Sequence, residues 1–241
     1  MKLTIIGSSH GVPEANRKCS CIMVKVGGNV YFVDMGTSGI DPLRKRNIPV
    51  ETVKGIFITH MHGDHINGLV EFVDLITWYF HDADPVVCLP NPDAGKIIDS
   101  WLDVTHNGCR KEIRYEKTHP GLVFDDGLLR VTAIPTRHDE NSHAYLLEAE
   151  GKRVLITGDM KHPGVDFPTA ALDKPLDLLI GEAAHFEAEE YLPVFEKCHI
   201  KKFCVTHYTD HFLPGVIHLC ETLNSRGIKA LRATDDLEIT V

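Results

Sequence analysis

The sequence THMHGDH occupies residues 59–65 and directly follows the apolar stretch 55–58. It supplies three imidazoles and one carboxylate, all of them side chains that bind transition metals: His60, His62, Asp64 and His65. Gly63 lets the backbone turn tightly enough for these groups to converge. Together they would block the open catalytic position of a single tetrahedral zinc ion, so the stretch predicts two metal ions that share it.

Further candidate ligands come shortly after other apolar runs: His138, Asp159 and His207. Gly158 permits a close approach of the backbone beside Asp159. A histidine at the end of a strand, or a Gly-Asp pair, is common without a metal. Their recurrence after successive predicted strands nevertheless favours ligation, because ligands are expected to gather at one edge of a sheet.

The whole chain alternates short strands with dispersed helices. Apolar runs rich in β-branched residues predict strands at 3–7, 20–26, 30–34, 55–59, 85–89, 128–134, 144–148, 154–157, 176–180, 202–206, 228–232 and 237–241. Helices are predicted at 41–46, 65–80, 92–104, 187–197 and 213–225. We expect Trp78 and Trp101 to pack in the core, with a substrate wall as the alternative. This pattern is typical of a layered α/β (α+β) fold, and without a repeat or linker we expect one domain over residues 1–241.

The order of Asp34, the HxHxDH stretch, His138, Asp159 and His207 resembles the ordered motifs of the metallo-β-lactamase superfamily. The resemblance covers almost the whole chain and implies a four-layer αββα sandwich. Carried over by position, it implies that one metal is held by three imidazoles: His60, His62 and His138. It implies a second metal held by Asp64, His65 and His207, with Asp159 bridging the two ions. Asp34 matches the first motif, whose carboxylate supports a ligand imidazole by hydrogen bonding.

Such a ligand set implies hydrolysis of an ester, amide or phosphodiester. Two ions lower the pKa of a shared water, so that metal-bound hydroxide is available as the nucleophile near neutral pH. Asp64 and Asp159 would offset part of the metal charge and are counted as catalytic for that reason. Zinc is the expected ion, and manganese and iron stay open because imidazole and carboxylate ligands suit all three.

Residues 7–13, GSSHGVP, resemble the opening loop of the ribonuclease Z-like and related phosphodiesterase branch. Only 20 residues separate His138 from Asp159, which leaves no room for the tRNA-binding arm of those enzymes. The resemblance therefore implies a phosphodiesterase that acts on a small diester, nucleotide-like or cyclic. Hydrolysis of a carboxylic ester, thioester or lactone is the alternative, and a non-hydrolytic iron redox or sensor protein is a remote one.

A general acid is expected among the remaining histidines. Glu182 and His185 follow the predicted strand 176–180, at the edge where the metals are expected, and an imidazole has a suitable pKa to protonate a leaving alkoxide. We assign His185 this catalytic role, with Glu182 as its supporting carboxylate. His10 and His211 are the alternatives, and a loop position without substrate contact stays equally open for His185.

Composition limits the partners and the compartment. Lys and Arg total 25 against 34 Asp and Glu, a net charge of −9, so no large nucleic acid is expected as a partner. The cysteines are odd in number and scattered, which predicts free thiols in a reducing compartment: Cys19, Cys21, Cys88, Cys109, Cys198, Cys204 and Cys220. With no apolar run of membrane-spanning length, we expect a cytoplasmic protein with a small-molecule substrate, no membrane partner and an oligomeric state left open.

Overall fold

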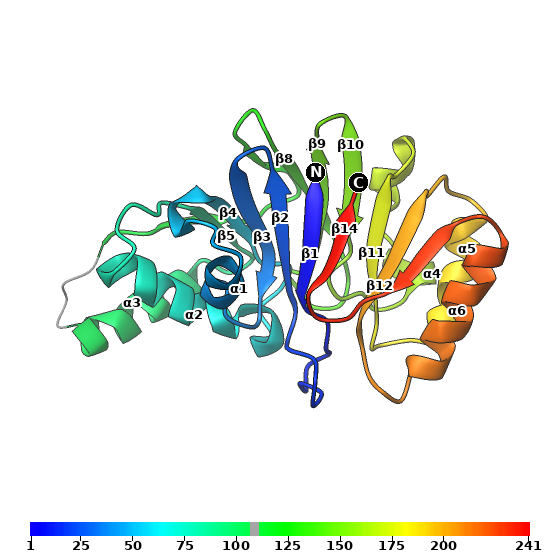
Figure 1. Cartoon of the computed structure of the whole chain (residues 1–241), viewed down its shortest axis with the longest axis horizontal. Helices are drawn as coiled ribbons and strands as arrows, with labels where there is room; N and C mark the ends of the chain where they lie inside the picture. The colour runs from blue at the N-terminus through cyan, green and yellow to red at the C-terminus, as the bar shows by residue number, and fades with distance from the viewer. Residues whose placement is uncertain (107–110) are drawn as a thin grey trace.

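The computed structural model describes residues 1–106 and 111–241, which form two stacked sheets with helices on both outer faces (Figure 1). The first sheet has seven strands in the order β14 (Leu237–Thr240), β1 (Lys2–Gly7), β2 (Cys21–Val26), β3 (Asn29–Met35), β4 (Val53–Phe57), β5 (Val86–Leu89) and β6 (Arg114–Lys117). The second sheet also has seven, in the order β13 (Lys229–Arg232), β12 (Lys202–Tyr208), β11 (Leu178–Ala183), β10 (Lys152–Ile156), β9 (His143–Ala149), β8 (Arg130–Pro135) and β7 (Gly121–Asp125).

Each sheet has its own set of helices on the side away from its partner sheet (Figure 1). The first sheet is covered by α1 (Ile40–Lys45), α2 (Gly63–Trp78) and α3 (Asp93–His106). The second is covered by α4 (Pro163–Asp166), α5 (Leu192–Phe195) and α6 (Leu213–Ser225), with 3-10 turns at Thr169–Asp173 and Ala188–Tyr191. A further 3-10 turn at Val50–Thr52 precedes β4. The predicted four-layer αββα sandwich is confirmed.

Successive side chains of a central strand point to opposite faces of its sheet, and in this fold both faces are buried. In β3, Tyr31 and Val33 point into the core between the sheets, whereas Val30 and Phe32 pack under the helices. A strand buried on both faces reads as a continuous apolar run, as this one does in the sequence. The same inter-sheet core receives Val131 from β8, so the two sheets share one apolar layer.

Most predicted elements are confirmed, with differences in detail. Strands β6 and β7 were not predicted, because RYEK is polar and the apolar run in GLVFD is only three residues long, and both strands are partly exposed. The helix predicted at 187–197 is divided into the 3-10 turn Ala188–Tyr191 and α5. Among the described cysteines all are free thiols, and Cys109 lies outside the described residues. None of the described helices is both long and apolar enough to cross a membrane.

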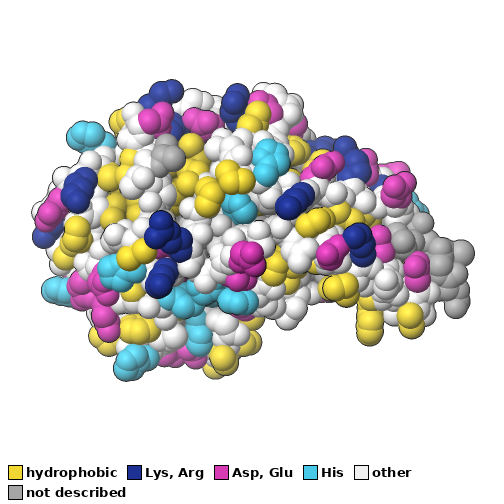
Figure 2. Space-filling view, turned by 180° about the vertical axis from the view of Figure 1, so that it is seen from behind, with side chains coloured by type: hydrophobic (Ala, Val, Ile, Leu, Met, Phe, Trp, Pro, Cys, Tyr) yellow, Lys and Arg dark blue, Asp and Glu magenta, His cyan; other side chains and the backbone are white. Residues whose placement is uncertain are grey.

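The prediction that Trp78 and Trp101 pack in the core is wrong. Their exposed fractions are 46% and 59%, and they lie on α2 and α3. Hydrophobic side chains project from this end of the molecule in Figure 2. Helical spacing alone does not separate a buried stripe from an exposed one, which is why the assignment failed.

The strand directions bring distant parts of the chain to one edge of the sandwich. Strands β3, β4 and β5 run parallel, as do β10, β11 and β12, so the segments that follow them leave each sheet at the same end. Residues 59–65 follow β4, and Asp159 follows β10. The fold therefore gathers the predicted ligands between the two sheets.

Gly36, directly after β3, allows α2 to begin close to the first sheet. A Cβ at this position would lie 1.7 Å from the backbone oxygen of Asp64. We expect Gly36→Ala to lower the free energy of unfolding by about 1–3 kcal/mol, as overpacking does elsewhere. Urea denaturation measures this loss. Gly28→Ala is the matched control, since nothing lies within 4 Å of the added Cβ, and equal midpoints for both variants would contradict the prediction.

Candidate metal centre

The loop between β4 and α2 positions most of the histidine-rich stretch. His62 is the N-cap residue of α2, with extended backbone angles (φ −67°, ψ 145°), and Asp64 lies in the first turn of that helix. A carboxylate there is favoured by the positive end of the helix dipole. Gly158 has a φ of +57°, and a Cβ on it would lie 2.7 Å from Thr59, so only glycine fits beside this loop. Asp159 is thereby held close to the histidines.

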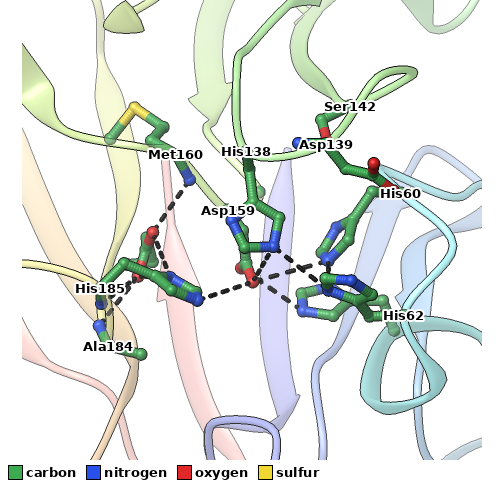
Figure 3. Close-up of polar contacts among 12 residues, drawn as sticks. His60, His62, His138, Asp139, Ser142, Asp159, Met160, Ala184 and His185 are labelled. Atoms are coloured by element: carbon green, nitrogen blue, oxygen red, sulfur yellow. Dashed lines mark hydrogen bonds and ion pairs between the residues drawn. The ribbon is translucent and has the colours of Figure 1, made fainter. Parts of the chain in front are cut away.

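The first ligand group contains three imidazoles and one carboxylate, whose ligand atoms all lie within 4.8 Å of one another: His60, His62, His138 and Asp159. Nδ1 of His62 lies 3.0 Å from Nε2 of His60 and 3.2 Å from Nε2 of His138. Oδ2 of Asp159 lies 3.6 Å from His60 and 3.7 Å from His138. Figure 3 shows these side chains turned toward one point beside the Asp159 carboxylate.

The second ligand group also adjoins Asp159 and contains Asp64, His65 and His207. Nε2 of His65 lies 3.2 Å from Oδ2 of Asp64 and 3.4 Å from Oδ1 of Asp159. Nε2 of His207 lies 3.3 Å from Oδ2 of Asp159. Asp159 therefore contacts both groups, in the position that the resemblance assigns to a bridging ligand.

Hydrogen bonds to the far side of three imidazoles orient their Nε2 atoms toward the centre. Nδ1 of His65 donates to Asp34 at 2.7 Å, and Nδ1 of His207 donates to the Ser9 carbonyl at 3.0 Å. Nδ1 of His60 donates to Oγ1 of Thr59, which itself donates to Asp34. These bonds fix the tautomer that leaves Nε2 with a free lone pair, the form that binds a metal. Thr59 was missed as a supporting residue although it opens the decisive stretch.

Two buried atoms in the centre have no hydrogen-bond partner, Nε2 of His65 and Oδ1 of Asp159. Buried polar atoms of this kind almost always have a partner, so their geometry fits a cation that they would share. Burial alone would raise the pKa of Asp159, but His207 and His65 outweigh it and hold the pKa well below its ordinary value. The carboxylate is therefore a buried negative charge that requires positive neighbours, as metal ions would be.

Burial also keeps part of the imidazole set neutral. It lowers the pKa of His60 to about 2, aided by the charge of His65, and it lowers the pKa of His138. A neutral imidazole is the form that ligates a metal, so no proton has to leave these side chains first. His65 differs, because Asp159 and Asp34 outweigh the effect of burial and hold its pKa well above the ordinary value, so a metal ion there would displace a proton. The donor set fits a pair of divalent ions in its geometry.

Glu182 and His185 extend the centre on the side of β11. Nδ1 of His185 lies 2.8 Å from the Glu182 carboxylate, and Nε2 lies 3.9 Å from Oδ2 of Asp159 (Figure 3). Glu182 is 1% exposed, and it also accepts hydrogen bonds from the backbone N–H of Met160 and of Ala184. Burial alone would lower the pKa of His185, but the hydrogen bond and charge of Glu182 outweigh it and raise the pKa.

The two alternative general acids lie in different places. His10 lines a cavity of about 230 Å³ above the ligands, together with Val12 and His185, and its Nε2 lies 3.2 Å from Glu14. His211 is exposed, and its ring contacts Phe212. It is not among the residues that line this cavity. Figure 2 shows histidine side chains gathered on one face of the molecule.

A family model, that of the Anti-Pycsar protein Apyc1, matches residues 1–215. This chain belongs to the Anti-Pycsar protein Apyc1 family. The matched region contains every ligand of the two groups and the His185–Glu182 pair. Membership of this family therefore rests on the part of the chain that builds the centre.

Known proteins similar to this member of the Apyc1 family include ribonuclease Z of Listeria monocytogenes serotype 4b (strain CLIP80459), 28% identical over 170 residues. That match covers 69% of this chain and 55% of the ribonuclease, so the chain spans about half the length of the curated relatives it matches. These similarities confirm the resemblance to the ribonuclease Z-like branch of the metallo-β-lactamase superfamily.

Solved structures share this fold at low sequence identity. Human tRNase Z, short form, has a TM-score of 0.75 at 20% identity, covering 100% of this chain and 99% of that one. A diphosphatase from the PhnP family has a TM-score of 0.70 at 19% identity, covering 100% and 97%. These similarities confirm the fold of this Apyc1-family chain.

Asp34 offers a test of how the centre is supported. Its carboxylate accepts hydrogen bonds from the Thr59 N–H at 2.7 Å, from the Thr59 hydroxyl and from His65. We expect Asp34→Asn to weaken metal affinity by about 10–100-fold, because an amide cannot accept all three bonds. Competition with a chromophoric chelator measures it. Asp236→Asn is the control, since both aspartates have positive φ (58° and 66°), and equal affinities in the two variants would refute the role of Asp34.

Proposed function

We propose that this chain is a dinuclear metal-dependent phosphodiesterase that acts on a small diester, nucleotide-like or cyclic. The observation that carries the proposal is the meeting of two ligand groups at Asp159, with His185 beside them at the cavity. Two divalent ions, with zinc as the expected metal, would supply a water molecule of lowered pKa and stabilise charge on the phosphoryl oxygens. The similarity to ribonuclease Z supports a diester in preference to other esters.

His185 is suited to the role of general acid. Its Nδ1–H donates to Glu182, which leaves Nε2 toward the cavity and the Asp159 carboxylate. With the imidazole protonated, Nε2 can transfer a proton to the leaving alkoxide as the P–O bond breaks. His185 is 35% exposed, so the proton is replaced from solvent after each turnover.

The size and charge of the cavity favour a small substrate. The cavity above the ligands measures about 230 Å³, below the range of ~300–1,000 Å³ common for ligand pockets. Among the described residues that line it are histidines and carboxylates but no lysine or arginine. Attraction of an anionic substrate would therefore come from the ions and from His185, which suits one phosphodiester group better than a polyanion.

The test is hydrolysis by metal-loaded protein of a panel of diesters, including cyclic nucleotides and bis(p-nitrophenyl) phosphate, alongside a carboxylic ester, a thioester and a lactone. Elemental analysis of the same sample counts the ions. We expect two metal ions per chain and turnover of diesters that is lost with a chelator. Two ions without diester turnover would refute the proposal, and turnover of the ester, thioester or lactone would establish that alternative activity.

A further inference from the structure

His207 adopts a backbone conformation that needs support. It lies near the end of β12 with a φ of 48°, in the left-handed region that non-glycine residues rarely occupy. Its N–H donates to the Ser8 carbonyl at 3.0 Å, and its Nδ1 donates to the Ser9 carbonyl at 3.0 Å. The position of this ligand therefore depends on the loop that follows β1.

That loop is closed by one carboxylate from the other end of the chain. Oδ1 of Asp235 accepts hydrogen bonds from the N–H of Ser8 at 3.0 Å and from its hydroxyl at 2.9 Å. Oδ2 accepts a bond from the Lys18 N–H at 2.8 Å, and the Lys18 carbonyl accepts a bond from the Ser9 N–H. Asp235 thus ties both ends of the loop and fixes the peptide groups that hold His207.

Asp235 itself is placed by both sheets. It lies in the turn between β13 and β14, drawn in red beside the lower end of β1 in Figure 1. The Ala233 N–H donates a hydrogen bond to the Val205 carbonyl of β12, and the Asp236 N–H donates one to the Ile5 carbonyl of β1. The turn is therefore a fixed support, and Arg17, which donates to the Ser8 and Tyr208 carbonyls, adds a second restraint on the same loop.

The loop supports one ligand group and not the other. It contacts His207, and a Cβ on Gly11 would lie 3.7 Å from Asp64. Within the described residues it makes no hydrogen bond to the imidazoles of the first group: His60, His62 and His138. A change in the loop should therefore affect the two groups unequally.

We infer that Asp235 is a positioning residue for the second metal site, acting through Ser8, Ser9 and His207. This inference rests on the proposed pair of ions. The side chain touches no ligand atom, so it acts only by holding the peptide groups that orient His207. Its loss should weaken the binding of one ion and leave the other unchanged.

The experiment is a zinc titration of the full metal-free chain against a chromophoric chelator, which separates two binding steps. Asp235→Ala should weaken one step by about 10–100-fold, as loss of a support behind a ligand does, and leave the other step within error. His207→Ala identifies which step belongs to the second group. Asp236→Asn is the control, because it removes the neighbouring carboxylate, whose partners Lys45 and Arg46 lie on or next to α1.

Ser8→Ala serves as a milder variant, since it removes only the hydroxyl bond to Asp235 and should weaken the same step by a smaller factor. Both steps unchanged in Asp235→Ala, or both weakened equally, would overturn the inference. If Asp235→Ala does not fold, Ser8→Ala decides by the same criterion. A wild-type chain that binds a single zinc ion would instead overturn the proposed dinuclear centre, so the two failures are distinguishable.

Discussion

Asp159→Asn is expected to remove both metal ions and, with them, diester hydrolysis. The Asp159 carboxylate lies within 3.7 Å of His60, His138, His65 and His207, and it is 3% exposed. Asparagine has nearly the same shape as aspartate but carries no charge. The positive charge of two metal ions would then be offset by one carboxylate fewer. The loss in affinity should exceed the ~10–100-fold that removal of a supporting residue costs.

Metal content by elemental analysis and turnover of bis(p-nitrophenyl) phosphate measure this effect in one sample. Asp177→Asn is the matched control, because Asp177 directly precedes β11, is largely buried and pairs with Lys201 at 2.9 Å. It should retain metal and turnover. An Asp159→Asn protein that still holds two ions and hydrolyses the diester would show that the two groups do not share this carboxylate.

His185→Gln is expected to reduce kcat without removing metal. A positioned general acid contributes about 10²–10⁴-fold, so we expect a loss of this size for a diester with an alkoxide leaving group. The loss should be much smaller for a p-nitrophenolate leaving group, which departs without a proton. His211→Gln is the control, since His211 is exposed and contacts Phe212. Equal losses for the two leaving groups would contradict proton transfer from His185, and a selective loss in His10→Gln would assign the role to His10.

The pH profile gives the same hypothesis a second readout. A general acid must be protonated, so turnover is lost as pH rises through its pKa. Glu182 raises the pKa of His185 against the effect of burial, so Glu182→Gln should lower that pKa. The alkaline limb of kcat should therefore move to lower pH in Glu182→Gln. An unchanged limb would separate the Glu182–His185 pair from the proton transfer step.

The convergence of the candidate ligands could be predicted because their chemistry is local in the sequence. Residues 59–65 bring together side chains that serve few other purposes at such density, and each remaining ligand follows a strand that parallel pairing carries to the same edge. Apolar runs, buried on both faces as in β3, predicted a layered α/β fold, and the αββα arrangement was implied by the family resemblance. These features depend on residues that are close neighbours in the chain or on regular strand direction.

Other features depend on contacts that no local pattern encodes. Asp235 accepts a hydrogen bond from Ser8, which lies 227 residues away in the sequence. Nothing in the sequence around a turn aspartate indicates such a distant partner. Apolar residues on the exposed face of α3 follow the same helical spacing as those on a buried face, so Trp101 was wrongly predicted to lie in the core. His10 and His185 both line the cavity, and their side-chain orientation emerges only from the fold.

The division of ligands between the two sheets has a consequence for the stability of the protein. His60, His62, Asp64 and His65 follow strand β4 of the first sheet, whereas His138, Asp159 and His207 belong to the second. Each ligand group draws on both sheets, so neither sheet alone supplies a complete group. If the proposed ions bind only the assembled sandwich, the free energy of unfolding would rise with the free metal concentration.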